Sequence, residues 1–229
     1  MNLNYPLYED IVDVKLVGYT QTPLDITMDD KTLSQIVAFC ARVSNPSNQN
    51  NNDTASKLLK YLAKNKHWSP FEMVNINVEI TTTRDIARQI LRHRSFAFQE
   101  FSQRYADPTK ELQFCLKPYR LQDVKNRQNS LDVADEKIKE GWLYDQEYLI
   151  NSATTLYHFY VKQGGAKECI RAILPEGNTV SRMYMNGSLR SWIHYLDVRL
   201  DPSTQYEHRI VAEKIKEIIV KLVPEIFET

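Results

Sequence analysis

The sequence has no surplus of charge, no cysteine motif and no long hydrophobic run, and each absence excludes a class of protein. Lysine plus arginine and aspartate plus glutamate both total 29 in 229 residues, so the formal net charge is zero. General nucleic-acid binders usually carry a basic surplus, because neutralisation of phosphates dominates their affinity. Any anion-binding site must therefore be a local concentration of positive charge. No apolar stretch approaches the length of a membrane span.

The three cysteines, Cys40, Cys115 and Cys169, lie far apart, and no CxxC pair or Cys/His ligand spacing accompanies them. A disulfide framework or a zinc site is therefore not expected. We interpret all three as buried, inert thiols. The N-terminal MNLNYPLYEDIVDV shows no basic region followed by an apolar run, so we expect no signal peptide. A cytoplasmic protein with reduced thiols is the simplest interpretation.

Hydrophobic periodicity predicts helices clustered around a few strands. β-branched residues predict a strand over 11–20, alternation in VNINVEI (74–80) predicts a half-buried antiparallel strand, and LQFCLKP (112–118) is a third candidate. Helices are predicted over about 31–43, 54–65 with Asp53 and Thr54 at its cap, 81–94, 132–163, 166–174, 189–200 and 203–222, with an extended or turn-like stretch over 178–188. No repeat, low-complexity tract or linker interrupts the chain. These features predict one α+β domain over 1–229, with a mostly antiparallel sheet.

The stretch RHRSFAFQEFSQRY (92–105) concentrates three arginines, a histidine and a glutamate around three phenylalanines. Arginine forks suit phosphate, and serine adds a short hydroxyl donor. Taken alone, the stretch favours the interpretation as a salt-bridged Glu–Arg core network. A single-stranded nucleic-acid-binding module is the alternative function, because Phe96, Phe98 and Phe101 could stack on bases. The zero net charge and the single patch count against that alternative.

Upstream of this stretch, Arg84, Arg88 and Arg92 are spaced by four and share one face of the predicted helix. A row of like charges repels itself and needs an acidic partner or an anionic ligand. On this helix alone we favour a solvated face balanced by Asp85 and nearby glutamates.

A family resemblance emerges from the order of the motifs. Arg92-His93-Arg94, seven residues, and then Ser102-Gln103-Arg104-Tyr105 resemble the signature of the flavin-dependent thymidylate synthases. Further segments resemble that family in the same order: ARVSNP (41–46), HWSPFE (67–72), RDIARQILRHR (84–94), CIRAILPEG (169–177) and LRSWIHYLDVRLDPSTQYE (189–207). The resemblance therefore covers nearly the whole chain.

The resemblance implies reductive methylation of dUMP to dTMP. In that reaction 5,10-methylenetetrahydrofolate is the one-carbon donor and NADPH supplies reducing equivalents through FAD. It also implies a homotetramer with active sites at subunit interfaces, with small-molecule substrates and neither a nucleic-acid nor a membrane partner. The family's α+β fold agrees with the periodicity.

The resemblance also assigns roles to residues. FAD contacts fall on His67, Ser69, Arg92, His93, Arg94, Glu100, Ser188, Arg190 and His194. dUMP contacts fall on Gln89, Arg92, Glu100, Ser102, Gln103, Arg104, Arg171 and Arg199. The catalytic role falls on Arg199, which would stabilise the ionised uracil ring. No residue is assigned to a metal.

Elementary chemistry supports this assignment. The pyrimidine C5 atom is a poor nucleophile, and cysteine-dependent thymidylate synthases activate it by adding a thiolate at C6. No cysteine here lies in a matching motif, so activation must be electrostatic, from a preorganised arginine. Flavin carries the redox chemistry that side chains cannot. His93, between Arg92 and Arg94, should be neutral, because like charges disfavour its protonation. An inactive relative acting as a scaffold is a further alternative, but Ser102 and Arg199 are retained.

Overall fold

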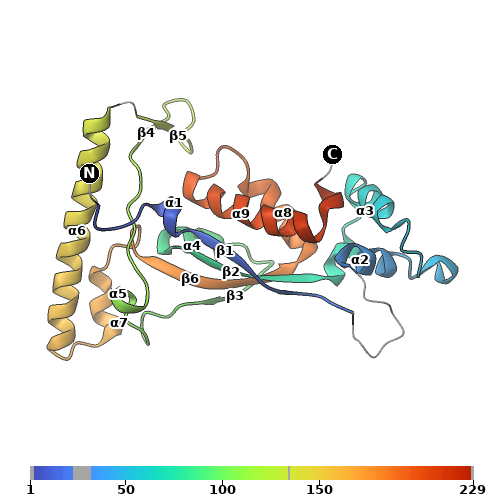
Figure 1. The fold of residues 1–229 in the computed structure, drawn as a ribbon, viewed down its shortest axis with the longest axis horizontal. Coiled ribbons are helices and arrows are strands. Elements are labelled where there is room, and N and C mark those ends of the chain that lie inside the picture. The colour runs from blue at the N-terminus through green and yellow to red at the C-terminus, as the bar shows by residue number, and fades with distance from the viewer. Residues whose placement is uncertain (1–2, 23–31, 134, 228–229) are drawn as a thin grey trace.

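A four-stranded sheet with the order β1-β2-β6-β3 lies at the centre of the fold (Figure 1). The structure, a computed structural model, describes residues 3–22, 32–133 and 135–227. The strands are β1 (Asp13–Tyr19), β2 (Asn75–Thr83), β3 (Ala97–Glu100) and β6 (Val180–Ser188), and a separate pair joins β4 (Arg120–Gln122) to β5 (Ser130–Asp132). Every ladder between these strands is antiparallel. The predicted α+β class with an antiparallel sheet is confirmed.

Helices cover the sheet and stand at both of its ends (Figure 1). They are α1 (Tyr8–Ile11), α2 (Leu33–Ala41), α3 (Ala55–Lys64), α4 (Arg84–Ile90), α5 (Pro108–Glu111), α6 (Glu136–Lys162), α7 (Lys167–Ile170), α8 (Leu189–Arg199) and α9 (Tyr206–Leu222), with 3-10 turns at Pro46–Asn48, Ser69–Met73, Arg171–Ile173 and Pro224–Ile226. Helices α4, α8 and α9 pack on the strands. The long α6 stands at one end, and α2 and α3 lie at the other.

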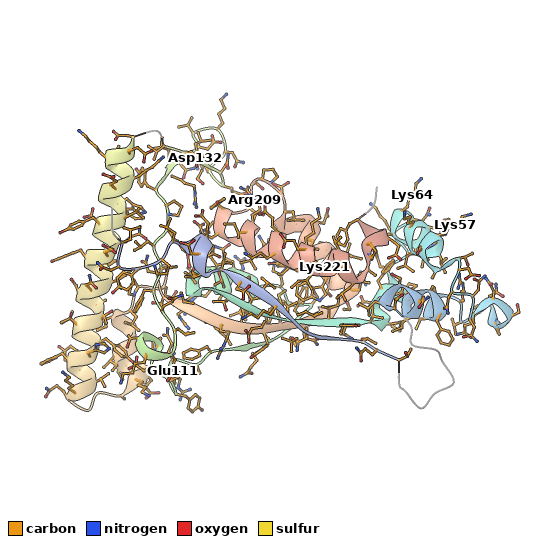
Figure 2. All side chains as sticks on the ribbon, viewed as in Figure 1. Lys57, Lys64, Glu111, Asp132, Arg209 and Lys221 are labelled. Atoms are coloured by element: carbon orange, nitrogen blue, oxygen red, sulfur yellow. The ribbon has the colours of Figure 1, made fainter. Side chains whose placement is uncertain are left out.

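The main core lies between the sheet and helices α4, α8 and α9. Alternation in β2 buries Ile76, Val78 and Ile80 completely, as the period-two pattern predicts. Trp192 of α8 is also fully buried, and its indole Nε1 donates to the Ile76 carbonyl at 3.1 Å. The space between these layers is filled with side chains, whereas charged residues such as Lys64 lie at the periphery (Figure 2). A smaller second core lies under α6.

Helix α4 is shorter than the predicted 81–94. Residues 81–83 are threonines, which favour extended backbone, and they continue β2 by pairing with residues 180–182 of β6. Thr83 keeps an extended backbone as the N-cap residue, and its hydroxyl donates to the Asp85 carboxylate at 2.6 Å. The helix therefore begins at Arg84.

The predicted strand over 112–118 is wrong. This segment makes only isolated bridges, from Phe114 to Thr179 and from Leu116 to Leu7. Phe114 and Leu116 are nonetheless buried in the second core. Burial of apolar residues, which the sequence pattern reports, therefore occurs here without a ladder.

The predicted cap of α3 is also wrong. Thr54 occupies the N-cap position, but its side chain makes no capping hydrogen bond. Its hydroxyl oxygen accepts instead from Nη2 of Arg42 at 2.7 Å. The buried Arg42 therefore takes the acceptor that the helix end would have used.

Gly187 leaves room for an aromatic ring on β6. A Cβ at this position would lie 2.4 Å from Cδ1 of Phe96, whose own ring packs 4.6 Å from the Trp192 ring. Trp192 packs against Phe96 and prevents its ring from moving away from the added methyl group. We therefore expect Gly187→Ala to destabilise the fold by about 1–3 kcal/mol. Urea denaturation measures this loss. In contrast, Gly141→Ala on α6 meets no heavy atom within 4 Å and should stabilise that helix slightly. Equal midpoints for the two variants would contradict the packing argument.

Candidate active site

Two of the predicted flavin contacts, Ser188 at the end of β6 and Arg190 in α8, are organised by one carboxylate, that of Glu72. The Ser188 hydroxyl donates to Oε2 of Glu72 at 2.5 Å, and Arg190 Nη1 donates to Oε1 at 2.8 Å. The Ser188 hydrogen bond is the main cause, and Arg190 a smaller one, of a Glu72 pKa below its usual range, although burial opposes them. Glu72 is the last residue of HWSPFE, so the motif carried a signal that the site assignment missed.

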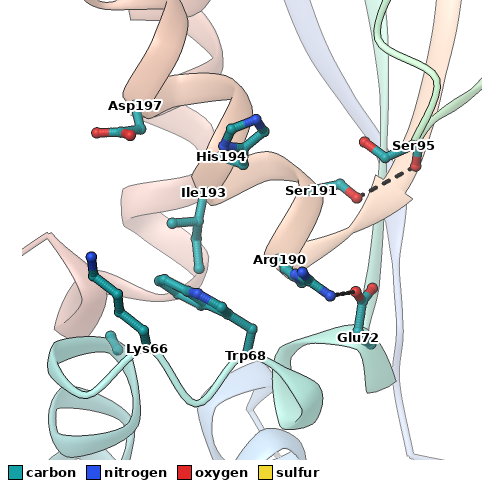
Figure 3. A pocket seen from close by; sticks show the side chains of 10 residues that line it. Lys66, Trp68, Glu72, Ser95, Arg190, Ser191, Ile193, His194 and Asp197 are labelled. Atoms are coloured by element: carbon teal, nitrogen blue, oxygen red, sulfur yellow. Dashed lines mark hydrogen bonds and ion pairs between the residues drawn. The ribbon is translucent and has the colours of Figure 1, made fainter.

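A cavity of about 730 Å³ adjoins this carboxylate. Its lining includes Arg190, His194, Trp68, Ile193 and Lys66. Figure 3 shows the Trp68 ring facing Ile193, with Lys66 on one side and Arg190 on the other. Glu72, which pairs with Arg190, and Asp197 also line the cavity. The flat apolar surface of Trp68 and Ile193 suits a heteroaromatic ligand, and Lys66 offers a cation to a phosphate that it carries.

Two further predicted flavin contacts lie next to Trp68 in the chain but do not line the cavity. His67 and Ser69 flank Trp68 in the chain, and both are exposed. The His67 ring meets the Tyr61 ring edge-on, with their centroids 6.0 Å apart. Of the predicted flavin contacts, Arg190 and His194 line this cavity.

Arg92 and Arg94 lie in the turn between α4 and β3. Both side chains are exposed, and neither forms a hydrogen bond or an ion pair with any residue in the described ranges. They are therefore available to a ligand or to another chain.

His93 and Arg199 form the most specific contact of the site. Arg199 Nε donates to His93 Nε2 at 2.9 Å, so the imidazole is an acceptor there and carries its proton on Nδ1. Burial, followed by the charges of Arg199 and His194, lowers the pKa of His93 to about 4. The prediction of a neutral His93 agrees with this, but the predicted cause was wrong, because burial and Arg199 dominate.

The two terminal amino groups of Arg199 take no part in the hydrogen bond to His93. Within the described ranges neither forms a hydrogen bond or an ion pair. The guanidinium is thus oriented through one nitrogen and still offers donors and a positive charge to a ligand. Gln89 lies in the same region, where it meets Gln205 and His208 at the start of α9.

The remaining predicted nucleotide contacts form a separate cluster. Gln103 and Arg171 line a cavity of about 300 Å³ together with Arg84 and Arg88. Nε2 of Gln103 is buried without a hydrogen-bond partner in the part of the chain that the structure describes. A buried unpaired donor is unfavourable, which favours a ligand or partner with an acceptor here. Arg104 lies nearby on the surface, with its Nε 3.6 Å from the Glu168 carboxylate.

Glu100 and Ser102 complete this second cluster. Glu100 Oε1 accepts from the Ser181 hydroxyl at 2.8 Å and lies 3.5 Å from Nη1 of Arg84. The Ser102 oxygen accepts from the Arg104 backbone N–H at 3.4 Å. Glu100 thus lies beside the nucleotide cluster, and no contact places it in the cavity lined by Trp68.

The arginine row on α4 is balanced differently from the prediction. Arg88 Nε donates to Glu176 at 2.9 Å, and Arg84 lies between Glu100 and Glu176. Asp85 pairs instead with Lys117 at 2.6 Å. The expected glutamates are therefore correct, and the expected Asp85 is wrong.

Helix α4 stands between the two clusters. Gln89 meets His208 of α9, whereas its neighbour Arg88 meets Glu176, since consecutive helical residues point about 100° apart. Gln89 contacts Gln205 and Arg199 contacts His93, whereas Gln103 and Arg171 line the cavity beside Arg88 and Glu176. A single chain therefore divides the predicted dUMP contacts into two groups.

The three cysteines differ in their burial. Cys115 is fully buried, and burial raises its pKa to about 12, so it is not a thiolate near neutral pH. Cys40 is partly buried, and burial raises its pKa too. Cys169 is exposed, so its predicted burial is wrong, because the short α7 lies at the surface.

Phe96 is buried against Trp192 and is not available to stack on a base. This removes one of the three rings on which the nucleic-acid alternative rests. Within residues 3–22, 32–133 and 135–227, no helix is long and apolar enough to cross a membrane. The same ranges contain no group of three or more His, Cys, Asp or Glu side chains that could hold a metal ion.

Comparisons of the sequence with known proteins agree with one another. Residues 26–225 match the family described as thymidylate synthase complementing protein. A flavin-dependent thymidylate synthase of Synechocystis sp. is 48% identical over 215 residues, which cover 93% of this chain and 96% of the relative. A probable flavin-dependent thymidylate synthase of Paramecium bursaria Chlorella virus 1 is also 48% identical, over 94% of this chain and 97% of the relative.

A solved structure shares the fold. A UMP/dUMP methylase from Streptomyces cacaoi, bound with 5-Br dUMP, superposes with a TM-score of 0.80. The match covers 100% of this chain and 96% of the other, at 22% sequence identity. At that identity the likeness establishes the arrangement of the strands and helices.

Proposed function

This chain belongs to the family of flavin-dependent thymidylate synthases, and from that membership we propose that it methylates dUMP to dTMP. In this proposal 5,10-methylenetetrahydrofolate is the one-carbon donor and NADPH is the reductant. One synthase domain spans residues 1–229. Its three free thiols suit a reducing compartment, and we place the enzyme in the cytoplasm.

The contact between Arg199 and His93 is the observation that carries the proposal. His93 accepts from Arg199 Nε and fixes the guanidinium, while the low pKa keeps the imidazole neutral. The two free amino groups of Arg199 would then stabilise negative charge on the uracil ring. A donor that is oriented before reaction loses no reorganisation energy when that charge develops. Greater negative charge on the ring raises the electron density at C5, where the new bond forms.

The cavity lined by Trp68 has the chemistry that FAD needs. Trp68 and Ile193 would face the flat ring, and Arg190 and Lys66 would meet the phosphates. His67, Ser69, Ser188 and His194 would supply polar contacts, together with Arg92, His93 and Arg94. When bound, FAD passes reducing equivalents from NADPH to the transferred carbon.

The second cluster would hold the nucleotide phosphate and sugar. Arg104 and Arg171 supply positive charge and Ser102 a hydroxyl. Gln103 supplies a buried donor that lacks a partner among the described residues. Gln89, Arg92 and Arg199 would contact the same dUMP from the other cluster. Because α4 separates the clusters in one chain, we propose that a homotetramer combines them from different subunits, with Glu100 at their boundary.

Helix α6 supports this assembly with an exposed apolar surface. Its large exposed side chains are Ile138, Trp142, Tyr144, Tyr148, Leu149, Leu156, Phe159 and Tyr160. Patches of this kind commonly mark contacts between subunits. The tetramer would bury them.

We expect the purified protein to bind FAD and turn yellow, to bleach with NADPH, and to recover its colour in air. With dUMP and 5,10-methylenetetrahydrofolate it should then form dTMP, which chromatography measures.

Arg190→Gln should weaken FAD binding about tenfold or more, the effect of losing one charge-assisted hydrogen bond. Arg127→Gln is the matched control, because it removes the same charge from the exposed loop between β4 and β5. A colourless protein that FAD cannot reconstitute would overturn the proposal.

A further inference from the structure

A line of buried and half-buried polar side chains connects Gln89 of the proposed dUMP site to a carboxylate in α9. Gln89 Nε2 donates to Gln205 Oε1 at 2.7 Å, and Gln205 Nε2 donates to Glu207 Oε2 at 2.9 Å. On the other side, Gln89 Oε1 lies 3.3 Å from His208 Nδ1, and His208 Nε2 lies 3.0 Å from the Tyr195 hydroxyl. Four of the five residues belong to α8, α9 or the turn between them.

Glu207 is ionised at the end of this line. Its side chain is 1% exposed, and Nη2 of Arg120 donates to its two oxygens at 2.8 and 2.9 Å. Burial would raise the pKa of Glu207, but the Arg120 charge and the hydrogen bonds from Gln205 and Arg120 outweigh it and hold the pKa below its usual range. The carboxylate can therefore only accept hydrogen bonds.

This carboxylate determines the direction of every bond in the line. Gln205 must turn its amino group to Glu207, so its carbonyl oxygen faces Gln89. Gln89 must then present its own amino group, and its carbonyl oxygen faces His208. An amide can otherwise adopt two orientations of similar shape, and its partners select one of them.

The far end of the line agrees with that direction. His208 must donate from Nδ1 to the Gln89 carbonyl, which leaves Nε2 free to accept from the Tyr195 hydroxyl. This is the neutral imidazole, and burial followed by the Arg199 and His93 charges lowers the pKa of His208 to about 3. All five groups are thus paired in one consistent pattern.

Among the residues that the structure describes, Gln89 retains one N–H without an acceptor. An amide nitrogen has two donors, and Gln205 takes only one. Gln89 contacts His208, whose ring lies 6.4 Å from that of His93, the partner of Arg199. The free donor therefore belongs to the side of the proposed nucleotide.

We propose that Glu207 is a positioning residue, whose carboxylate acts through Gln205 to hold the Gln89 amide as a donor to an acceptor oxygen of dUMP. The inference rests on the proposed function, because it needs dUMP at Gln89. The acceptor is a carbonyl oxygen of the uracil or an oxygen of the phosphate. A reversed Gln89 would place its own carbonyl oxygen against that acceptor, and the two would repel.

The test measures dUMP affinity in variants that break the line. Glu207→Gln can donate or accept, so it no longer selects one direction, and we expect dUMP to bind about tenfold more weakly. Gln205→Met breaks the same line and leaves the Glu207–Arg120 pair in place, so it covers the case in which Glu207→Gln fails to fold. FAD affinity and bleaching by NADPH should remain at wild-type values in both.

A double-mutant cycle with Gln89→Ala separates positioning from general destabilisation. In the Gln89→Ala background, Glu207→Gln should weaken dUMP binding no further. Tyr8→Phe is the structural control, since the Tyr8 hydroxyl donates to the Glu207 backbone carbonyl and not to the line. It should lower stability without changing dUMP affinity. Effects of Gln89→Ala and Glu207→Gln that multiply would overturn the inference.

Deoxyuridine distinguishes the two acceptors, because it lacks the phosphate. A loss of affinity that persists with deoxyuridine assigns the acceptor to the uracil, and one that disappears assigns it to the phosphate. Wild-type protein that binds no dUMP would instead contradict the proposed function. Protein that makes dTMP, with unchanged dUMP affinity in both line variants, would contradict only the role of Glu207.

Discussion

Replacement of Arg199 by alanine is expected to reduce kcat for dTMP formation by about 100-fold to 1000-fold while FAD remains bound. Loss of one preorganised donor at a developing negative charge typically costs this much. Arg199 is oriented by His93 and has two amino groups free for the substrate, so its removal takes the donor and the charge together. Single-turnover formation of dTMP measures the effect, and the flavin absorbance of the same sample reports occupancy.

Arg199→Lys is the informative companion. Lysine keeps the charge but lacks the fork that lets one nitrogen hold His93 while the others face the ligand. We expect its kcat to lie between those of the wild type and the alanine variant. Loss of FAD in parallel with activity would instead show that Arg199 maintains the structure of the site.

Acidification is expected to destabilise the fold through His208. The side chain is fully buried, and its pKa is about 3 in the fold against 6.5 in an ordinary exposed histidine. Between those values the unfolded chain binds a proton that the folded chain does not, so stability falls as the pH falls. From pH 7 to pH 5 this residue alone should cost about 2 kcal/mol. Urea midpoints at a fixed protein concentration measure the loss.

His208→Gln removes the titrating group and keeps a polar side chain. The variant should be less stable than the wild type at pH 7, yet it should lose less stability on going to pH 5. In both proteins His93 should also contribute to the loss of stability on acidification, because its pKa in the fold is lowered too. Equal losses in the wild type and the variant would show that His208 does not remain neutral in the fold.

Local patterns predicted most of the secondary structure. Alternation identified β2, and helical spacing identified α2, α3, α6, α8 and α9 close to their observed bounds. The failures occur where partners distant in sequence decide the outcome. Residues 81–83 are extended because β6 lies beside them, and Phe114 bridges to Thr179 without forming a strand.

The motifs identified residues of the proposed site, but not the contacts that organise them. His93 is neutral mainly through burial and Arg199, which lies 106 residues away in the chain. Glu72 and His208 were missed as organising residues, since their partners are equally remote. A linear pattern also cannot divide the predicted dUMP contacts between the two sides of α4. That division depends on which face of the helix meets α9.

The Glu72 carboxylate has a thermodynamic consequence for ligand binding. It fastens Ser188 and Arg190 to the turn that carries Trp68, so these side chains are ordered before any ligand arrives. A flexible arginine would give up about 0.5–1.5 kcal/mol of rotamer entropy on being immobilised at a binding site. Here Arg190 loses that entropy during folding, so the free energy of ligand binding does not include this cost.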